Sequence, residues 1–185
     1  MIRDIIRDAE TKMANAVEYA KEEFAAIRTG RAHPAMFVKL TADYYGSPTP
    51  LQQLATFQVP DARVILITPY DPSAMTAIER SIRDSDLGVN PSNDGHSIRL
   101  AFPPLTQERR KELVKRVKHM AEEGRVAVRN ARRDGRKHLD SLEKGGELSS
   151  DEVGRAGRDL DKLTHAIEAD IDKALADKEQ ELLEV

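Results

Sequence analysis

The chain has 185 residues, a formal net charge of −3 and a pI near 6.0; 33% of its residues are charged and only 4% are aromatic. This composition favours long, solvent-exposed helices over an enclosed catalytic pocket. The sequence has no cysteine, which excludes disulfides, thiolate metal sites and a cysteine nucleophile. No apolar run approaches the roughly 18 residues of a membrane span, and the charged N-terminal residues do not resemble a secretory signal. We therefore expect a soluble, cytoplasmic protein.

The first thirty residues predict one amphipathic helix. Gly30 is a natural residue beyond a helix C-terminus, and Pro34 discourages continuation of the helix. The apolar stripe has steps of three or four residues and comprises Ile2, Ile5, Ile6, Ala9, Met13, Ala16, Val17, Ala20, Phe24 and Ile27.

In residues 31–104 the spacing of apolar residues no longer follows the helical repeat throughout, and short strand-like runs appear. This change predicts a small β/α domain. One helix is expected at residues 73–85, with an apolar inner face. Turn-forming residues occur at 46–50, 60–61 and 90–95. Short runs with the residue types and alternation of β-strands occur at 37–40, 42–45, 56–59, 63–68 and 97–102.

Two further long helices follow the double proline at 103–104. The first runs from its expected N-cap, Thr106, to about Glu143. The second starts at a capping box formed by Ser149 and Glu152. Three long helices with narrow apolar stripes cannot bury those stripes alone, so we predict an antiparallel three-helix bundle. The fold class is thus α+β with two domains.

The predicted bundle consists of residues 1–30 and 105–185, and the β/α domain of residues 31–104 is inserted between the first and second helices. Two short chain crossings would join the domains, and such junctions usually allow interdomain motion. A rigidly packed junction is the alternative.

The second long helix carries a row of arginines. Arg125, Arg129, Arg132 and Arg136 are spaced by four, three and four residues and share one helical face. Residues 106–140 contain twelve Lys and Arg against six acids, although the whole chain is acidic. A positive field of this kind attracts polyanions, and planar guanidinium groups suit phosphate oxygens. We expect these groups to point outward without intramolecular partners, and we expect shape and phosphate recognition of RNA because aromatic residues are scarce.

A simpler interpretation is that the acidic C-terminal segment neutralises the arginines within the bundle, since residues 141–185 contain thirteen acids against six basic residues. Catalytic and cofactor chemistry has little support. The five histidines are scattered without metal-ligand spacing, and no phosphate-binding glycine loop is present. We expect no catalytic residue, no metal and no cofactor. A hydrolase site in the β/α domain remains a third, weaker alternative.

Several motifs, in order along nearly the whole chain, resemble those of the bacterial ribosome recycling factor family. They are Arg28-Thr29-Gly30-Arg31-Ala32 with Pro34, Tyr44-Tyr45-Gly46 with 48–51, residues 85–91, residues 103–111, residues 126–134 and residues 177–182.

The resemblance implies an L-shaped molecule that enters the ribosome after peptide release and, with elongation factor G and GTP, splits it into subunits. The bundle would bind mainly large-subunit RNA, and the β/α domain would face the small subunit and the elongation factor. A monomer without enzymatic activity is implied. By resemblance, the RNA-binding residues are Arg129 and Arg132, with Arg133, Arg28, Arg31 and Arg109 as further contributors, and the hinge comprises Gly30, Arg31, Pro103, Pro104 and Leu105.

Four glycines depart from the family pattern where alanine or charged residues are expected: Gly124, Gly135, Gly145 and Gly146. A glycine inside a helix costs about 0.5–1 kcal/mol relative to alanine, which predicts a less rigid bundle. The alternative function, of a different class, is a helical chaperone or scaffold that binds protein partners.

Overall fold

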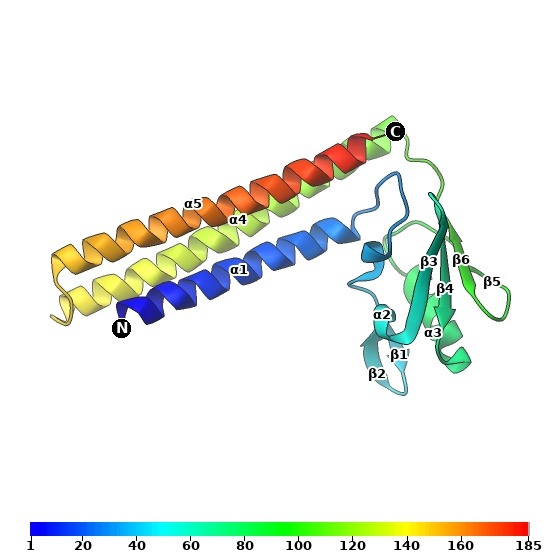
Figure 1. The fold of residues 1–185 in the computed structure, drawn as a ribbon, viewed down its shortest axis with the longest axis horizontal. Helices are drawn as coiled ribbons and strands as arrows, with labels where there is room; N and C mark the ends of the chain where they lie inside the picture. Colours follow the sequence, from blue (N-terminus) through cyan, green and yellow to red (C-terminus); the bar gives the residue numbers. More distant parts are fainter. Residues whose placement is uncertain (185) are drawn as a thin grey trace. The chain divides into compact units, whose positions relative to one another are not determined.

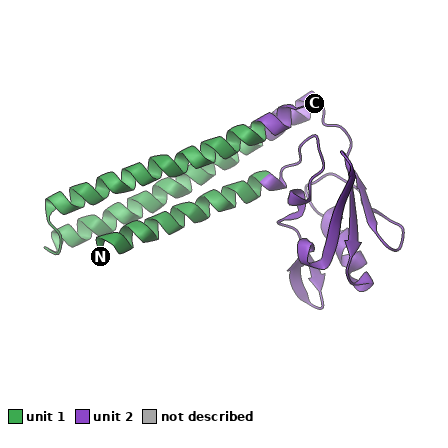
Figure 2. Ribbon diagram, in the orientation of Figure 1, with its two compact units in different colours: residues 1–24, 115–179 green, residues 25–114, 180–185 purple. Residues whose placement is uncertain are grey.

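A computed structural model describes residues 1–184 of the chain. The chain divides into two compact units, one of residues 1–24 and 115–179 and the other of residues 25–114 and 180–185 (Figure 2). The ends of the long helices are thus grouped with the second unit, whereas the sequence-based division into 1–30 with 105–185 and 31–104 keeps each long helix whole; α1 ends at Ala26, before the expected end at Gly30.

The first unit is a bundle built from three long helices (Figure 1): α1 (Ile2–Ala26), α4 (Gln107–Lys144) and α5 (Ser150–Leu183). In α4, Gly124 lies against Ala20 and Ile171, whereas Gly135, further along, lies against Leu160. Residue numbers therefore rise along α4 as they fall along α5, and α4 is antiparallel to the other two helices. The three-helix bundle is confirmed. Its buried apolar side chains include Met13, Val17, Val117, Val128, Leu139, Val153, Leu160 and Ile171.

The helix ends follow the capping chemistry that the sequence predicts. The hydroxyl of Thr106 accepts a hydrogen bond from the backbone N–H of Arg109 at 3.1 Å. Ser149 and Glu152 form the reciprocal capping box: the Ser149 N–H donates to the Glu152 carboxylate at 2.8 Å, and the Glu152 N–H donates to the Ser149 hydroxyl at 3.3 Å. The Ser149 hydrogen bonds lower the pKa of Glu152.

Gly146 ends α4 in a left-handed conformation, with φ of 75°. The N–H of Gly146 donates to the Glu143 carbonyl at 2.9 Å, and the N–H of Glu147 donates to the Leu142 carbonyl at 2.9 Å. These two bonds form a Schellman motif, which satisfies carbonyl groups at the helix end. This glycine is therefore a stop signal and not a weak point within a helix.

Gly124 and Gly135 are buried where α4 packs against its neighbours. A Cβ atom at Gly124 would lie 3.3 Å from both Ala20 and Ile171, and one at Gly135 would lie 3.1 Å from Leu160. A charged side chain at either position would therefore enter the core. The glycines permit a close approach of the helices, which accounts for their place in the sequence better than flexibility does.

The second unit contains a four-stranded antiparallel sheet in the order β3-β4-β6-β5 and a separate hairpin of β1 and β2 (Figure 1). Ile65 and Ile67 of β4 pair with Leu100 and Ile98 of β6, and all four are fully buried. They pack in one core with Ile78 and Ile82 of the helix α3. The elements are η1 (Pro34–Phe37), β1 (Thr41–Tyr44), β2 (Ser47–Pro50), α2 (Leu51–Leu54), β3 (Ala55–Asp61), β4 (Val64–Pro69), η2 (Pro72–Ala74), α3 (Met75–Arg83), β5 (Ser92–Asn93) and β6 (Ile98–Ala101).

Several local predictions in this unit are wrong, including the turns expected at 60–61 and 90–95, where β3 continues to Asp61 and β5 occupies Ser92–Asn93. Residues 37–40 do not form a strand, because Pro34 opens the short 3-10 helix η1 and the His33 side chain caps it by accepting from the Ala35 N–H at 3.0 Å. Residues 47–50 form strand β2, although they were expected to be part of a turn. The prolines at 48 and 50 are tolerated because the hairpin is a two-stranded sheet with free edges.

Candidate RNA-binding residues

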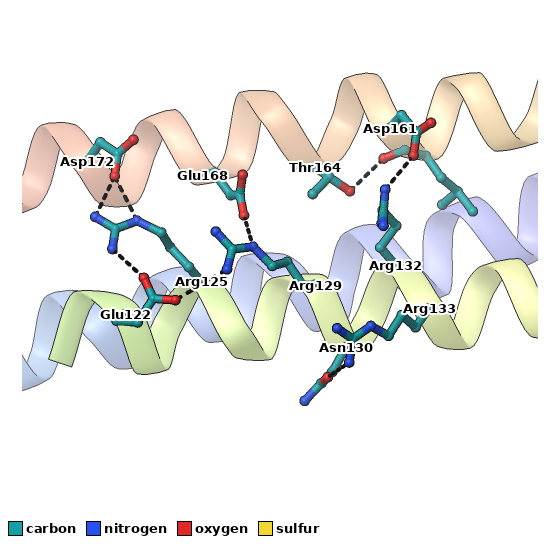
Figure 3. Close-up of polar contacts among 11 residues, drawn as sticks. Glu122, Arg125, Arg129, Asn130, Arg132, Arg133, Asp161, Thr164, Glu168 and Asp172 are labelled. Atoms are coloured by element: carbon teal, nitrogen blue, oxygen red, sulfur yellow. Dashed lines mark hydrogen bonds and ion pairs between the residues drawn. The ribbon is translucent and has the colours of Figure 1, made fainter. Parts of the chain in front are cut away.

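Three arginines of α4 form ion pairs with acids of α5, in an arrangement that we call the arginine ladder: Arg125, Arg129 and Arg132 with Asp172, Glu168 and Asp161 (Figure 3). Arg125 lies 2.8 Å from the Asp172 carboxylate through Nη2 and donates to the Glu122 carboxylate at 2.9 Å through Nη1. Burial acts to lower the pKa of Arg125, but the hydrogen bonds to Asp172 and Glu122 outweigh it and raise this pKa overall.

Arg129 and Arg132 continue the arginine ladder. The Nε of Arg129 donates to Glu168 at 2.7 Å, and its Nη1 donates to Glu122 at 3.2 Å. The Nη1 of Arg132 donates to Asp161 at 2.9 Å, whereas its Nε is buried without a hydrogen-bond partner among the described residues. Glu122 therefore bridges two consecutive arginines, and each arginine reaches across to α5 (Figure 3).

The prediction that these arginines lack intramolecular partners is wrong, and the neutralisation that the acidic C-terminal segment suggested does occur at all three. The physical reason is the position of the arginine face, which lies beside the apolar seam and so borders the neighbouring helix. A signal for this pairing exists in the sequence. Asp161, Glu168 and Asp172 are spaced by seven and four residues, which places them on one face of α5.

The pairing does not remove Arg129 and Arg132 from solvent. Their side chains are 43% and 41% exposed. Ion pairs between partly exposed side chains contribute only about 0–1 kcal/mol. A guanidinium group has five N–H donors, and the ion pairs of Arg132 use only Nη1. The arginine ladder can therefore present positive charge and free donors to an incoming anion at a small energetic cost.

Arg133 and Arg136 complete the basic surface of α4. Arg133 is exposed, and its Nη1 donates to the Asn130 side chain at 3.4 Å without a carboxylate partner among the described residues. The guanidinium of Arg136 occupies the space that a Cβ atom at Gly157 would need. Gly157 thus leaves room for the Arg136 guanidinium against α5.

Arg28, in the second unit, has a different environment. Its guanidinium lies over the ring of Phe102, with Cζ 5.3 Å from the centroid. Its Nε and Nη2 atoms are buried and have no hydrogen-bond partner in the described part of the chain. Burial lowers the pKa of Arg28, and the nearby positive charges of Arg109 and Arg63 lower it further. The structure therefore brings three cations close together, and among residues 1–184 it pairs Arg28 with no acid.

The remaining predicted residues also lie in the second unit. Arg109 pairs with Glu112 on the same helix at 2.9 Å, and Arg31 is exposed. Sequence reasoning missed Arg63 and Phe102 as neighbours of Arg28, and no local pattern connects them. The five predicted hinge residues, Gly30, Arg31, Pro103, Pro104 and Leu105, all fall within this unit.

In residues 1–184, no helix is long and apolar enough to cross a membrane. Over the same residues, no three His, Asp or Glu side chains gather in a way that could hold a metal ion.

Comparison with known proteins identifies relatives along the whole chain. A family model described as "Ribosome recycling factor" matches residues 20–183. The ribosome-recycling factor of Acidothermus cellulolyticus is 58% identical over 185 residues, which is all of both chains. That of Cutibacterium acnes is 58% identical over 182 residues, or 98% of this chain and 99% of the relative.

Solved structures agree with these matches. A solution structure of the ribosome recycling factor has a TM-score of 0.80 and 42% identity and covers 100% of this chain and 98% of its own. Models for the T. thermophilus ribosome recycling factor and the E. coli elongation factor G bound to the E. coli post-termination complex give a TM-score of 0.69 and 43% identity, with both chains fully covered. The matches give no support to a chaperone or scaffold. The chain belongs to the ribosome recycling factor family.

Proposed function

We propose that this protein is a cytoplasmic, non-catalytic translation factor that recycles ribosomes. It binds the post-termination ribosome between the subunits as a monomer, and with elongation factor G and GTP it promotes dissociation so that ribosomes can re-enter initiation. The observation that carries this proposal is the full-length match to ribosome recycling factors, one of which is described with elongation factor G on the post-termination complex. GTP hydrolysis takes place on the elongation factor.

Subunit splitting of purified post-termination ribosomes tests this function directly. Light scattering should fall when the protein, elongation factor G and GTP are all present. Omitting the protein, or replacing GTP with a non-hydrolysable analogue, should leave the signal high. Equal splitting with and without the protein would contradict the proposal.

We infer that ribosomal RNA phosphates bind Arg129 and Arg132 of the arginine ladder by exchanging with the carboxylates of α5. Arg129 and Arg132 are partly exposed and weakly held, and Arg133 beside them has no carboxylate partner among the described residues. A phosphate that meets such groups gains charge-assisted hydrogen bonds in place of the intramolecular ones. Arg28, Arg31 and Arg109 supply further contacts from the second unit.

Arg132→Ala should weaken binding to the large ribosomal subunit by about 30-fold, the effect of losing a central arginine worth about 2 kcal/mol at an interface. The fold should persist, because the side chain is partly exposed and makes one ion pair. Binding measured at several salt concentrations should show a shallower salt dependence for the variant than for the wild type. Arg155→Ala, at an exposed position of α5, is the matched control and should bind normally. Full-strength binding by folded Arg132→Ala would remove Arg132 from the site.

We also propose that Gly30, Arg31, Pro103, Pro104 and Leu105 form a hinge that lets the β/α domain change orientation during splitting, with that domain facing the small subunit and the elongation factor. Locking the two domains with an engineered disulfide should preserve ribosome binding and block splitting. The reduced form of the same variant is the control and should split ribosomes normally. Unimpaired splitting by the oxidised form would count against the hinge.

A further inference from the structure

Tyr45, at the tip of the β1–β2 hairpin, has a backbone conformation that its side chain disfavours. Tyr44 pairs with Ser47, so Tyr45 and Gly46 form a two-residue turn, and both have positive φ, 50° and 79°. Such turns favour Asn or Asp followed by Gly, and a bulky residue with positive φ is rare. Among the described residues, Tyr45 is the one non-glycine residue with positive φ.

The side chain of Tyr45 gains little burial in return, because the residue is 84% exposed. Its ring meets the ring of Tyr44 edge to face, with centroids 4.6 Å apart. Tyr70, the residue after strand β4, is also 67% exposed. Three of the four tyrosines in the chain therefore lie in these two segments, and two of them are open to solvent. Strained, exposed residues of this kind point to function more than to stability.

The two segments that contain Tyr44, Tyr45 and Tyr70 also carry acidic residues. The Tyr44 hydroxyl donates to Asp71 at 2.8 Å, and the backbone N–H of Ser73 donates to the same carboxylate at 2.9 Å. These bonds hold Asp71 as a fixed carboxylate beside the tyrosines. Asp43 is exposed on β1, and residues 41–50 and 68–76 contain no Lys or Arg.

We propose that Tyr45, Tyr70, Asp43 and Asp71 form a docking surface for an arginine or lysine side chain of a protein partner in the recycling complex. The face of a tyrosine ring attracts a cation, and neighbouring carboxylates strengthen this attraction. The same charges repel the phosphates of RNA. Its residues differ from the arginines proposed to bind RNA. The inference rests on the proposed function for the identity of the partner.

Tyr45→Asn is the informative variant, because asparagine suits the turn and removes the ring. Its melting temperature should equal or exceed that of the wild type. Its binding to purified post-termination ribosomes with elongation factor G should weaken by about 3- to 30-fold, the range expected for one cation–π contact. Tyr45→Phe keeps the ring and should bind nearly as well as the wild type.

Asp43→Lys distinguishes a basic protein partner from RNA. The variant should bind more weakly if the partner is basic, whereas tighter binding would show that the surface meets RNA and would overturn the proposal. Photo-crosslinking from Tyr45→p-benzoylphenylalanine in the same purified complex should give a protein product whose crosslinked peptide contains Arg or Lys. A crosslink to RNA, to a second copy of the chain or to nothing would also overturn it.

The outcomes separate this inference from the proposed function. If the wild type splits ribosomes and Tyr45→Asn binds as well as Tyr45→Phe, only the docking surface is wrong. If the wild type neither binds nor splits ribosomes, the proposed function is wrong and the docking surface loses its partner with it.

Discussion

The arginine ladder of the first unit and Arg28 of the second unit occupy opposite electrostatic environments. In the first unit, Arg125, Arg129 and Arg132 each have a carboxylate partner on α5. In the second unit, Arg28 is held over Phe102, beside two other arginines, with two donor atoms buried and unsatisfied. A paired arginine stabilises the fold slightly, whereas buried donors without partners destabilise it.

Among the variants that test this difference between the two units, Arg28→Met should have the largest effect on stability and ribosome affinity. Methionine keeps an apolar stem on Phe102 and removes two buried donors that lack partners, so the free energy of unfolding should rise by about 1 kcal/mol. Ribosome affinity should fall about tenfold, because one charge-assisted contact with phosphate is lost. Chemical denaturation and ribosome binding give the two values. Arg80→Met, on exposed α3 surface of the same unit, should change neither, and a destabilised Arg28→Met would show that the guanidinium supports the fold.

Arg125→Met should have the reverse profile. This arginine makes three ion contacts with Asp172 and Glu122 and is only 20% exposed. Its loss should lower the free energy of unfolding by about 1 kcal/mol and leave ribosome affinity within about threefold. Denaturant titration of Arg125→Met beside Arg28→Met makes the comparison in one experiment. If both variants shifted stability in the same direction, the contrast between the two units would fail.

The smallest expected effect concerns Glu168→Gln, which keeps the shape of the partner and removes its charge. The Nε of Arg129 would face a neutral oxygen, and a phosphate would no longer compete with Glu168 for it. Ribosome affinity should rise about two- to threefold at low salt, and stability should fall by no more than about 1 kcal/mol. Equilibrium binding at two salt concentrations measures this gain. Glu123→Gln, on the exposed face of α4, is the charge-matched control, and a loss of affinity in Glu168→Gln would mean that Glu168 positions Arg129 for RNA.

Much of the fold could be predicted because its signals are local. Apolar periodicity predicted the three long helices, and the capping residues Thr106, Ser149 and Glu152 predicted where two of them begin. Residues 37–40 were misassigned because a proline and a histidine cap a few positions earlier determine the local structure.

The candidate site was predictable only in part. The arginines and their shared face on α4 could be predicted from the sequence. The hydrogen-bond and ion-pair partners of each guanidinium, however, depend on which side chains of a neighbouring helix or strand lie beside it. Arg129 and Arg132 pair with acids about 30 to 40 residues away in the sequence. Arg28 contacts Phe102, and nearly the whole sequence of the β/α domain lies between these two residues. No spacing rule reports such distant neighbours, although the acidic face of α5 was visible in the sequence.

The Schellman motif at Gly146 has a consequence for engineering and for natural variation. It fixes where α5 starts relative to the end of α4, and successive residues of an α-helix are rotated by about 100° about its axis. Inserting or deleting one residue between Gly146 and Ser149 would rotate or shift α5 relative to α4. Leu160 and Ile171 would then leave the core, or the acids of α5 would no longer lie opposite the arginines. The length of this short connection is therefore under a double constraint, and we expect it to tolerate substitution far better than a change in length.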